Sequence, residues 1–125
     1  GTQYLTFMLN GEHYGIEILR VQGVQGWQRV TQIPNMPAFL LGVINMRGDV
    51  VPIVDLRLKL GCPTAEYNSF TVVIVLNVKN RVVGAVVDSV SDVLELNRDA
   101  IPSELRQLML TSTNKLLIKS VKSPC

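Results

Sequence analysis

Histidine and cysteine are scarce in this chain, and their scarcity excludes several kinds of site. Among 125 residues there are one histidine, His13, and two cysteines, Cys62 and Cys125. Two cysteines do not make the disulfide framework of a small secreted domain, and with a single histidine they have no zinc-site spacing. We therefore expect both cysteines to be unpaired thiols in a reducing compartment and His13 to be a strand residue beside a turn.

The sequence also lacks the signatures of catalysis and nucleotide binding. No serine lies in a strand-turn-helix glycine motif, neither cysteine has a nearby basic partner, and the stretch from Gly42 to Gly48 lacks the lysine of a phosphate-binding loop. Asp49 and Asp55 flank an apolar run, which is typical of polar groups at a turn and a strand end rather than of paired catalytic carboxylates. The sequence thus predicts no enzyme, no cofactor and no metal.

Charge and hydropathy limit the partners in the same way. The chain has 12 basic and 10 acidic residues, mixed along its length, so that no basic surface for nucleic acid or anionic lipid is predicted. No apolar run reaches the ~18 residues of a membrane span, and the N-terminus has no signal-peptide pattern. With 47% hydrophobic residues in 125, we expect a single folded cytoplasmic domain without direct membrane insertion.

What the chain does have is strand-forming residues arranged around tight turns. Asn10-Gly11 is the favoured pair of a type I′ turn, and Arg47-Gly48-Asp49 has the turn chemistry of a hairpin with a glycine position. Three hairpins are predicted, pairing Tyr4–Leu9 with His13–Ile16, Val43–Ile44 with Val50–Val54, and Phe70–Leu76 with Val82–Val87. The last pair is so apolar that its strands must be central or covered.

Arg47 is predicted to lie exposed at the tip of the second hairpin, on a stiff support. Pro37 and Gly42 predict a single helical turn just before this hairpin, since proline opens and glycine closes such turns. After it, the alternation in 57–60 predicts that the strand continues. A charged side chain held out of an apolar segment serves either solubility or contact with a partner.

Other segments leave alternatives open. In 17–27 a short helical turn competes with an irregular strand, and strand is favoured after Arg20. Trp27 is interpreted as a half-buried strand end, with a binding hot spot as the alternative. The last third, which has no glycine after Gly84, predicts a helix over 102–110 and a closing strand over 116–118.

The two halves of the chain share a spacing of glycine and valine residues. Val21 and Val24 follow Gly15 at the same offsets at which Val90 and Val93 follow Gly84. Chance similarity among apolar strands is one explanation of this pattern. The other is a duplication, which predicts two small β units of similar design.

Six segments carry a resemblance to a known family, in the family's own order: Tyr4–Phe7, Tyr14–Gln22, Ile33–Phe39, Gly42–Gly48, Val51–Arg57 and Val82–Leu94. Together, from Gln3 to Leu96, they resemble the CheW family of bacterial chemotaxis coupling proteins, and the Asn45-Met46-Arg47-Gly48 motif is specific to it. The resemblance implies an all-β fold of two small five-stranded β-barrels packed on a shared hydrophobic core with short helices. The approximate sub-barrels would be built around 1–60 and 61–125, with strand exchange between them as an option.

The resemblance also implies a function and a site. It implies a non-enzymatic scaffold, recruited to membrane receptor clusters, that binds the cytoplasmic tip of methyl-accepting chemoreceptors and the regulatory domain of the chemotaxis histidine kinase. By position, the partner-binding residues would be Val21, Val24, Asn45, Arg47, Gly48 and Asp49. One alternative is a CheW-like domain of a larger chemotaxis protein; another, of a different class, is a small β-barrel that binds single-stranded nucleic acid.

Two departures from the family pattern bear on these expectations. Gly23 stands where the family usually has an acidic residue, and Gln25 stands where a basic one is frequent, so that a charged receptor contact is missing. The stretch 97–125 is shorter than in the family and lacks its glycine-bearing loop. The second barrel is therefore expected to be incomplete, or completed by another copy of the chain through self-association.

Overall fold

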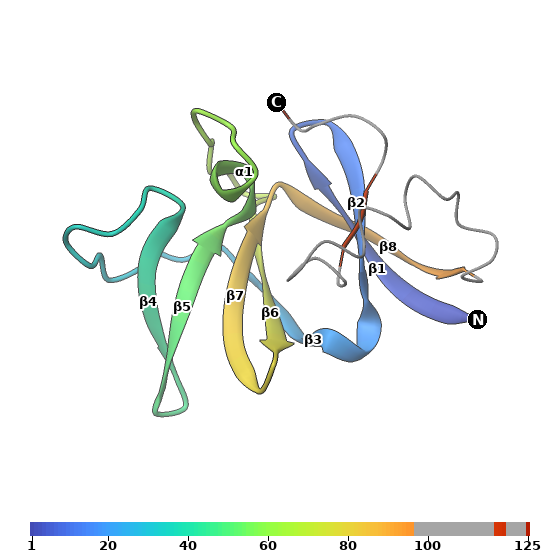
Figure 1. Ribbon diagram of the computed structural model, residues 1–125, viewed down its shortest axis with the longest axis horizontal. Coiled ribbons are helices and arrows are strands. Elements are labelled where there is room, and N and C mark those ends of the chain that lie inside the picture. Colours follow the sequence, from blue (N-terminus) through green and yellow to red (C-terminus); the bar gives the residue numbers. More distant parts are fainter. Residues whose placement is uncertain (97–116, 120–124) are drawn as a thin grey trace.

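The computed structural model describes residues 1–96, 117–119 and 125, which form two β-sheets side by side with two short helical turns (Figure 1). The strands and helical turns have these bounds: β1 (Thr2–Leu9), β2 (Glu12–Glu17), η1 (Ile18–Arg20), β3 (Val21–Gly26), β4 (Leu40–Met46), β5 (Asp49–Asp55), α1 (Leu56–Lys59), β6 (Val72–Val78), β7 (Arg81–Val87), β8 (Ser89–Leu96) and β9 (Leu117–Lys119). One sheet has the order β8-β1-β2-β9 and the other the order β3-β6-β7-β5-β4. The predicted all-β class is confirmed.

The three predicted hairpins are all present, and each closes with a two-residue turn. In Asn10-Gly11, Arg47-Gly48 and Lys79-Asn80 both residues have positive φ, from 48° to 89°. That geometry is the type I′ turn, whose twist matches the twist of the strands it joins. The strand after Arg20 is also confirmed as β3, and it follows a helical turn, η1, so that both structures considered for this segment occur in succession.

The β1–β2 and β6–β7 hairpins exchange the strands that follow them: each of these strands pairs with the other hairpin. β3 follows the β1–β2 hairpin but pairs with β6, with Val24 opposite Ile74, whereas β8 follows the β6–β7 hairpin but pairs with β1, with Leu5 opposite Val93. Both sheets consequently contain strands from both halves of the chain. The division into sub-barrels at residue 60 stays a prediction.

In the part of the chain that the structure describes, two core clusters lie on the two faces of the five-stranded sheet. Phe7 of β1 and Ile16 of β2 pack with Ile74, Leu76 and Val87 of the five-stranded sheet, which fills the seam between the two sheets. The second cluster joins the buried side chains Val51, Ile53, Val73 and Val86. Alternate residues of β6 supply the two clusters, so that β6 is buried on both faces. β6 also lies inside the sheet, between β3 and β7. Both observations confirm the central or covered position that its continuous apolar run predicted.

Two local predictions around the central hairpin are wrong. Residues 56–59 form the helical turn α1 instead of a continuing strand, because the Asp55 carboxylate accepts hydrogen bonds from the backbone N–H groups of Arg57 and Leu58 and so caps a helix start. The segment after Pro37 is not helical but a single turn, closed by a 3.0 Å hydrogen bond from the N–H of Leu40 to the Pro37 carbonyl.

Gly42 lies inside β4 rather than at a helix end. Its φ is +152°, and a Cβ at this position would lie 2.1 Å from the carbonyl oxygen of Thr31. Thr31 reaches so close because it exchanges backbone hydrogen bonds of 2.9 and 3.1 Å with Val43, forming an isolated bridge along the edge of the sheet. Glycine is needed here for a close backbone approach, not for ending a helix.

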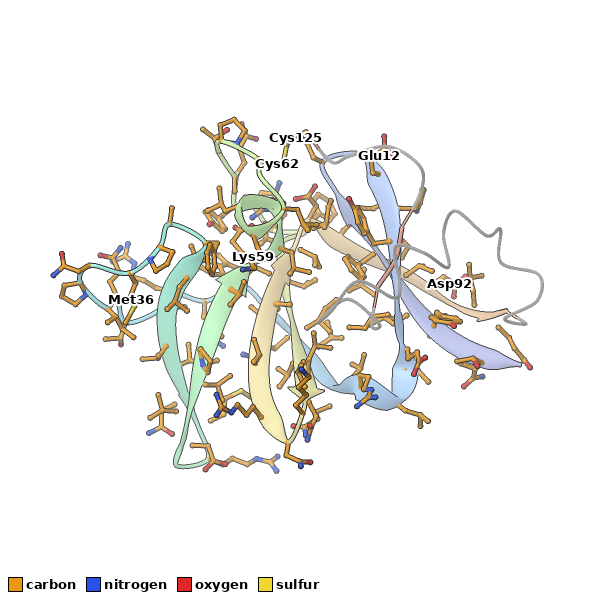
Figure 2. All side chains as sticks on the ribbon, viewed as in Figure 1. Glu12, Met36, Lys59, Cys62, Asp92 and Cys125 are labelled. Carbon is orange, nitrogen blue, oxygen red and sulfur yellow. A yellow bond between two sulfur atoms is a disulfide. The ribbon has the colours of Figure 1, made fainter. Side chains whose placement is uncertain are left out.

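The expectation of two unpaired thiols is also wrong. Cys62 and Cys125 form a disulfide with their Cα atoms 5.2 Å apart (Figure 2). The pairing joins residues 63 positions apart, and only the tertiary fold brings them together. Of the two predictions for the end of the chain, the strand is confirmed at 117–118 by β9, which pairs with β2, whereas the helix over 102–110 lies outside the described residues.

Candidate functional site: a groove beside the Arg47 turn

A groove of about 390 Å³ runs between β3 and the β4–β5 turn. Valines form its apolar part, and residues of β3 and of the turn form the rest; the lining comprises Gln22, Gly23, Val24, Gln25, Met46, Arg47, Asp49, Val51, Val75 and Val82. β3 and β4 are the two edge strands of the five-stranded sheet. A shared groove therefore means that the sheet curls and brings residues from its opposite edges around one hollow.

The turn that carries Arg47 is built by its neighbours. The N–H of Gly48 donates a 2.8 Å hydrogen bond to Oδ1 of Asn45, and Gly48 has a φ of +89° that favours glycine. Arg47 itself is exposed, as predicted. Asn45 and Gly48 thus fix the backbone of the turn, and the Arg47 side chain is presented to solvent at its tip.

The six predicted site residues fall into three groups. Val24, Arg47 and Asp49 line the groove, and the Val24 side chain is 46% exposed. Asn45 and Gly48 shape the turn beside it. Val21 is separate, because a register irregularity between Val21 and Gly23 directs its side chain against the core cluster at the seam of the two sheets. The structure brings five of the six together, and their part in binding stays a prediction.

The groove lining combines apolar and charged side chains. Val24 and Val82 supply apolar surface above the nearly buried Val51 and Val75, and Arg47 and Asp49 supply one charge of each sign. Gly23 leaves open space, since a Cβ there meets no atom within 4 Å. Among residues 1–96, 117–119 and 125, no group of three or more histidine, cysteine or acidic residues could hold a metal ion, and no helix is long and apolar enough to cross a membrane.

A buried ion pair at the other end of β5, away from the groove, was not predicted from the sequence. The side chains of Asp55 and Arg57 are 0% and 5% exposed, and the guanidinium donates to both carboxylate oxygens, with distances of 3.0 Å from Nε and 2.8 Å from Nη2. Its Nη1 reaches Asp88 at 2.6 Å and the carbonyl of Glu66 at 2.7 Å. The hydroxyl of Tyr67 donates to Asp55 at 2.7 Å. The pair therefore ties the end of β5 to the following loop and to the end of β7.

Hydrogen bonding keeps this carboxylate charged. Burial by itself raises the pKa of Asp55, but hydrogen bonds from Arg57 and Tyr67 and the Arg57 charge outweigh it and lower the pKa below its ordinary value of 3.8. Burial, and then the hydrogen bond to Asp55, raise the pKa of Tyr67 to about 12. Every charge in the cluster has a partner, so that the cluster has a structural role rather than that of an acid or base.

Tyr67 extends this cluster to the end of β3. Its ring stacks on Trp27 with 4.6 Å between the ring centroids, and the Arg57 guanidinium lies 5.1 Å from the Tyr67 centroid. Trp27 is half-buried directly after β3, which confirms the interpretation as a strand end. The Trp27–Tyr67 stack thus connects the end of β3 to the ion pair. In the sequence, the only sign of this stack was an isolated tryptophan.

The fold and the groove define a class of protein, an all-β domain of two sheets with a groove on the curled five-stranded sheet. Comparison with known proteins identifies the family. The model of the CheW-like domain matches residues 3–117. The chain is 52% identical over 101 residues to the chemotaxis protein CheW of Klebsiella aerogenes and 42% identical over 104 residues to that of Rhizobium meliloti, covering 81% and 82% of this chain. The chain belongs to the CheW-like family.

A solved structure agrees with this assignment. The crystal structure of the scaffolding protein TtCheW from Thermoanaerobacter tengcongensis has a TM-score of 0.75 and 29% sequence identity, covering 80% of this chain. The chain spans 65% of the length of that protein, 61% of the Klebsiella relative and 67% of the Rhizobium relative. The shared fold is therefore established over most of this chain, which corresponds to about two thirds of its relatives.

Proposed function

We propose that this protein is a non-enzymatic scaffold of bacterial chemotaxis that couples membrane chemoreceptors to the chemotaxis histidine kinase. Its family and the names of its relatives, chemotaxis protein and scaffolding protein, support this function over nucleic-acid binding. The observation that carries the proposal is the groove, which is lined by Val24 of β3, Arg47 of the β4–β5 turn and Asp49 of β5. The protein would work in the cytoplasm, at receptor clusters, either alone or as a domain of a larger chemotaxis protein.

The geometry of the groove suits it for binding a protein partner. Apolar side chains of a receptor tip or of a kinase regulatory domain would bury against the valines, and Arg47 would pair with an acidic group on the partner. Because a two-residue turn holds the Arg47 backbone, little backbone freedom is lost on binding. Gly23 adds no charge to the groove, so that Arg47 and Asp49 carry its electrostatic specificity.

Replacing Arg47 with alanine tests the proposal. We expect Arg47→Ala to weaken co-sedimentation with receptor and kinase fragments about tenfold, which is about 1.4 kcal/mol, because an interfacial charge loses its partner. The matched control is Arg20→Ala, which removes an exposed arginine of η1 outside the groove lining. The midpoint of urea unfolding should not change in either variant, since both side chains are exposed.

Three outcomes would contradict the proposal. The first is equal loss of binding in both variants, which would indicate a general charge effect. The second is a lower unfolding midpoint of Arg47→Ala with normal binding, which would give Arg47 a structural role. The third is no binding of the unmodified protein to either fragment. The self-association predicted from the shortened end of the chain is checked in the same samples by their solution mass.

A further inference from the structure

The disulfide joins parts of the fold that belong to different sheets. Cys62 follows α1, which continues directly from β5 of the five-stranded sheet. Cys125 follows β9, which pairs with β2 at the edge of the four-stranded sheet. Figure 2 shows both cysteines together at the end of the molecule opposite the β4–β5 turn. The bond thus links the end of α1 to the chain that follows the edge strand β9, far from the groove.

The two sulfur atoms have different surroundings. Cys62 is only 5% exposed, and its N–H donates a 2.9 Å hydrogen bond to the carbonyl of Arg57, so that the buried ion pair holds its backbone in place. It lines a polar cavity of about 350 Å³ together with Asn10, Arg57 and Asp88. Cys125 is exposed, and its Sγ accepts a 3.4 Å hydrogen bond from Nδ2 of Asn10 in the β1–β2 turn. Cys125 is therefore the more exposed partner of the bond, which favours its sulfur as the point of attack by a thiol in solution.

The strand next to this bond has a short ladder. β9 pairs with β2 through three residue pairs, Tyr14 with Lys119, Gly15 with Ile118 and Ile16 with Leu117. A three-residue edge strand gains little from its own hydrogen bonds, because ordering the chain costs about as much as those bonds contribute. A covalent link at Cys125, which follows β9 in the sequence, limits the conformations open to the chain when β9 is unpaired and thus favours pairing. The state of the disulfide should therefore decide how firmly β9 stays on β2.

We propose that Cys62 and Cys125 form a redox latch that holds β9 on the four-stranded sheet and opens by exchange with a low-molecular-weight thiol such as glutathione. The thiolate attacks the sulfur of Cys125, a mixed disulfide forms there, and Cys62 leaves as a thiolate and takes up a proton. A second thiol attacks the mixed disulfide and releases Cys125 as a thiol. In sum, two thiols are oxidised to one small disulfide, and the protein disulfide gains two electrons and two protons; the same couple drives closure in reverse.

The test uses the full chain in buffers of increasing ratio of reduced to oxidised glutathione. Free thiols are counted by maleimide labelling and mass spectrometry, and hydrogen exchange is followed in peptides that cover β2. We expect the intramolecular disulfide to disappear along a single titration curve, and the β2 amides that face β9 to exchange at least tenfold faster in the reduced protein. Cys125→Ser should exchange like the reduced protein at every ratio.

The single-cysteine variants test the order of attack. In Cys62→Ser the remaining Cys125 should form a mixed disulfide with oxidised glutathione at least tenfold faster than Cys62 does in Cys125→Ser. The proposal is overturned by equal hydrogen exchange of β2 in both redox states, by two free thiols in fully oxidising buffer, or by a disulfide that links two chains. Faster reaction of Cys62 than of Cys125 would overturn the assigned point of attack.

Discussion

The buried pair of Asp55 and Arg57 permits a quantitative prediction about stability. Arg57→Met keeps most of the apolar volume of the side chain but removes the guanidinium, and it leaves a carboxylate that is 0% exposed without its cation. Removing one member of a buried ion pair costs about 3 to 5 kcal/mol, because the desolvated charge that remains is uncompensated. Asp88 adds little to this cost, since its side chain is 31% exposed and can regain water.

Urea unfolding followed by circular dichroism measures the effect. With a typical slope of about 1.5 kcal/mol per molar urea, the loss lowers the midpoint by about 2 to 3 M. Arg20→Met removes an exposed arginine and should change the free energy of unfolding by less than about 0.5 kcal/mol. The double variant Asp55→Asn with Arg57→Met should recover part of the loss, because no bare charge then remains in the core.

The pH dependence gives an independent check with a definite sign. In the unmodified protein the pKa of Asp55 is lower when folded than its ordinary value of 3.8, so that its contribution to stability is complete above about pH 4 and is lost as the pH falls through the lower, folded pKa. In Arg57→Met, burial should raise the pKa of Asp55 instead, because the guanidinium that offset the burial is gone. The variant should therefore recover stability relative to the unmodified protein between pH 7 and pH 5.

Two results would refute this reasoning. One is a midpoint shift in Arg57→Met no larger than that in Arg20→Met, which would mean that the buried pair contributes no net stability. The other is an equal stability difference between variant and unmodified protein at pH 7 and pH 5, which would mean that no bare carboxylate remains in the core.

Three further predictions concern Gly42 and Tyr67. Gly42→Ala should destabilise the protein by about 2 kcal/mol or more, because its Cβ meets the backbone carbonyl of Thr31, whereas Gly23→Ala, which has open space, should be nearly neutral in the same urea assay. Tyr67→Phe should cost about 1 kcal/mol, because Asp55 loses a hydrogen bond while the ring can still stack. The unmodified protein should also lose stability between about pH 10 and 12, which is the range between the ordinary pKa of Tyr67 and its raised pKa in the folded protein. Tyr67→Phe should lose less stability over this range. Equal loss in both proteins would contradict this prediction.

The hairpins could be predicted because their signals are local. Asn10-Gly11 and Arg47-Gly48 specify turn geometry within two residues, and the alternation around them specifies the strands. α1 was missed because the alternation in 57–60 favoured a strand over the helix start that Asp55 caps. The buried pair at this cap has distant partners, Tyr67 on Asp55 and Asp88 on Arg57, which no local pattern joins. The disulfide was missed for the same reason, since only the tertiary fold brings its two cysteines together.

The groove was predictable only in part. The resemblance to the family indicated Val24, Arg47 and Asp49, which do line it. Its valine floor depends on how far the sheet curls, and curvature is a property of several paired strands rather than of a sequence window. Val21 lies apart from the groove, because its partly buried side chain packs against the core cluster at the seam beside a register irregularity that no sequence window shows. Its part in binding stays a prediction.

The exchanged pairing of β3 and β8 has a consequence for how the chain folds. A hydrogen bond between Thr6 of β1 and Asp92 of β8 spans 86 positions, so that one sheet cannot close until nearly all of the described N-terminal part of the chain is available. Contacts of such long range raise the contact order and slow folding. The β1–β2 hairpin pairs with β8 and the β6–β7 hairpin pairs with β3, so that each depends on a strand from the other half of the chain. The two halves should therefore fold in one cooperative step. A newly made chain should remain unfolded until β8 has emerged from the ribosome.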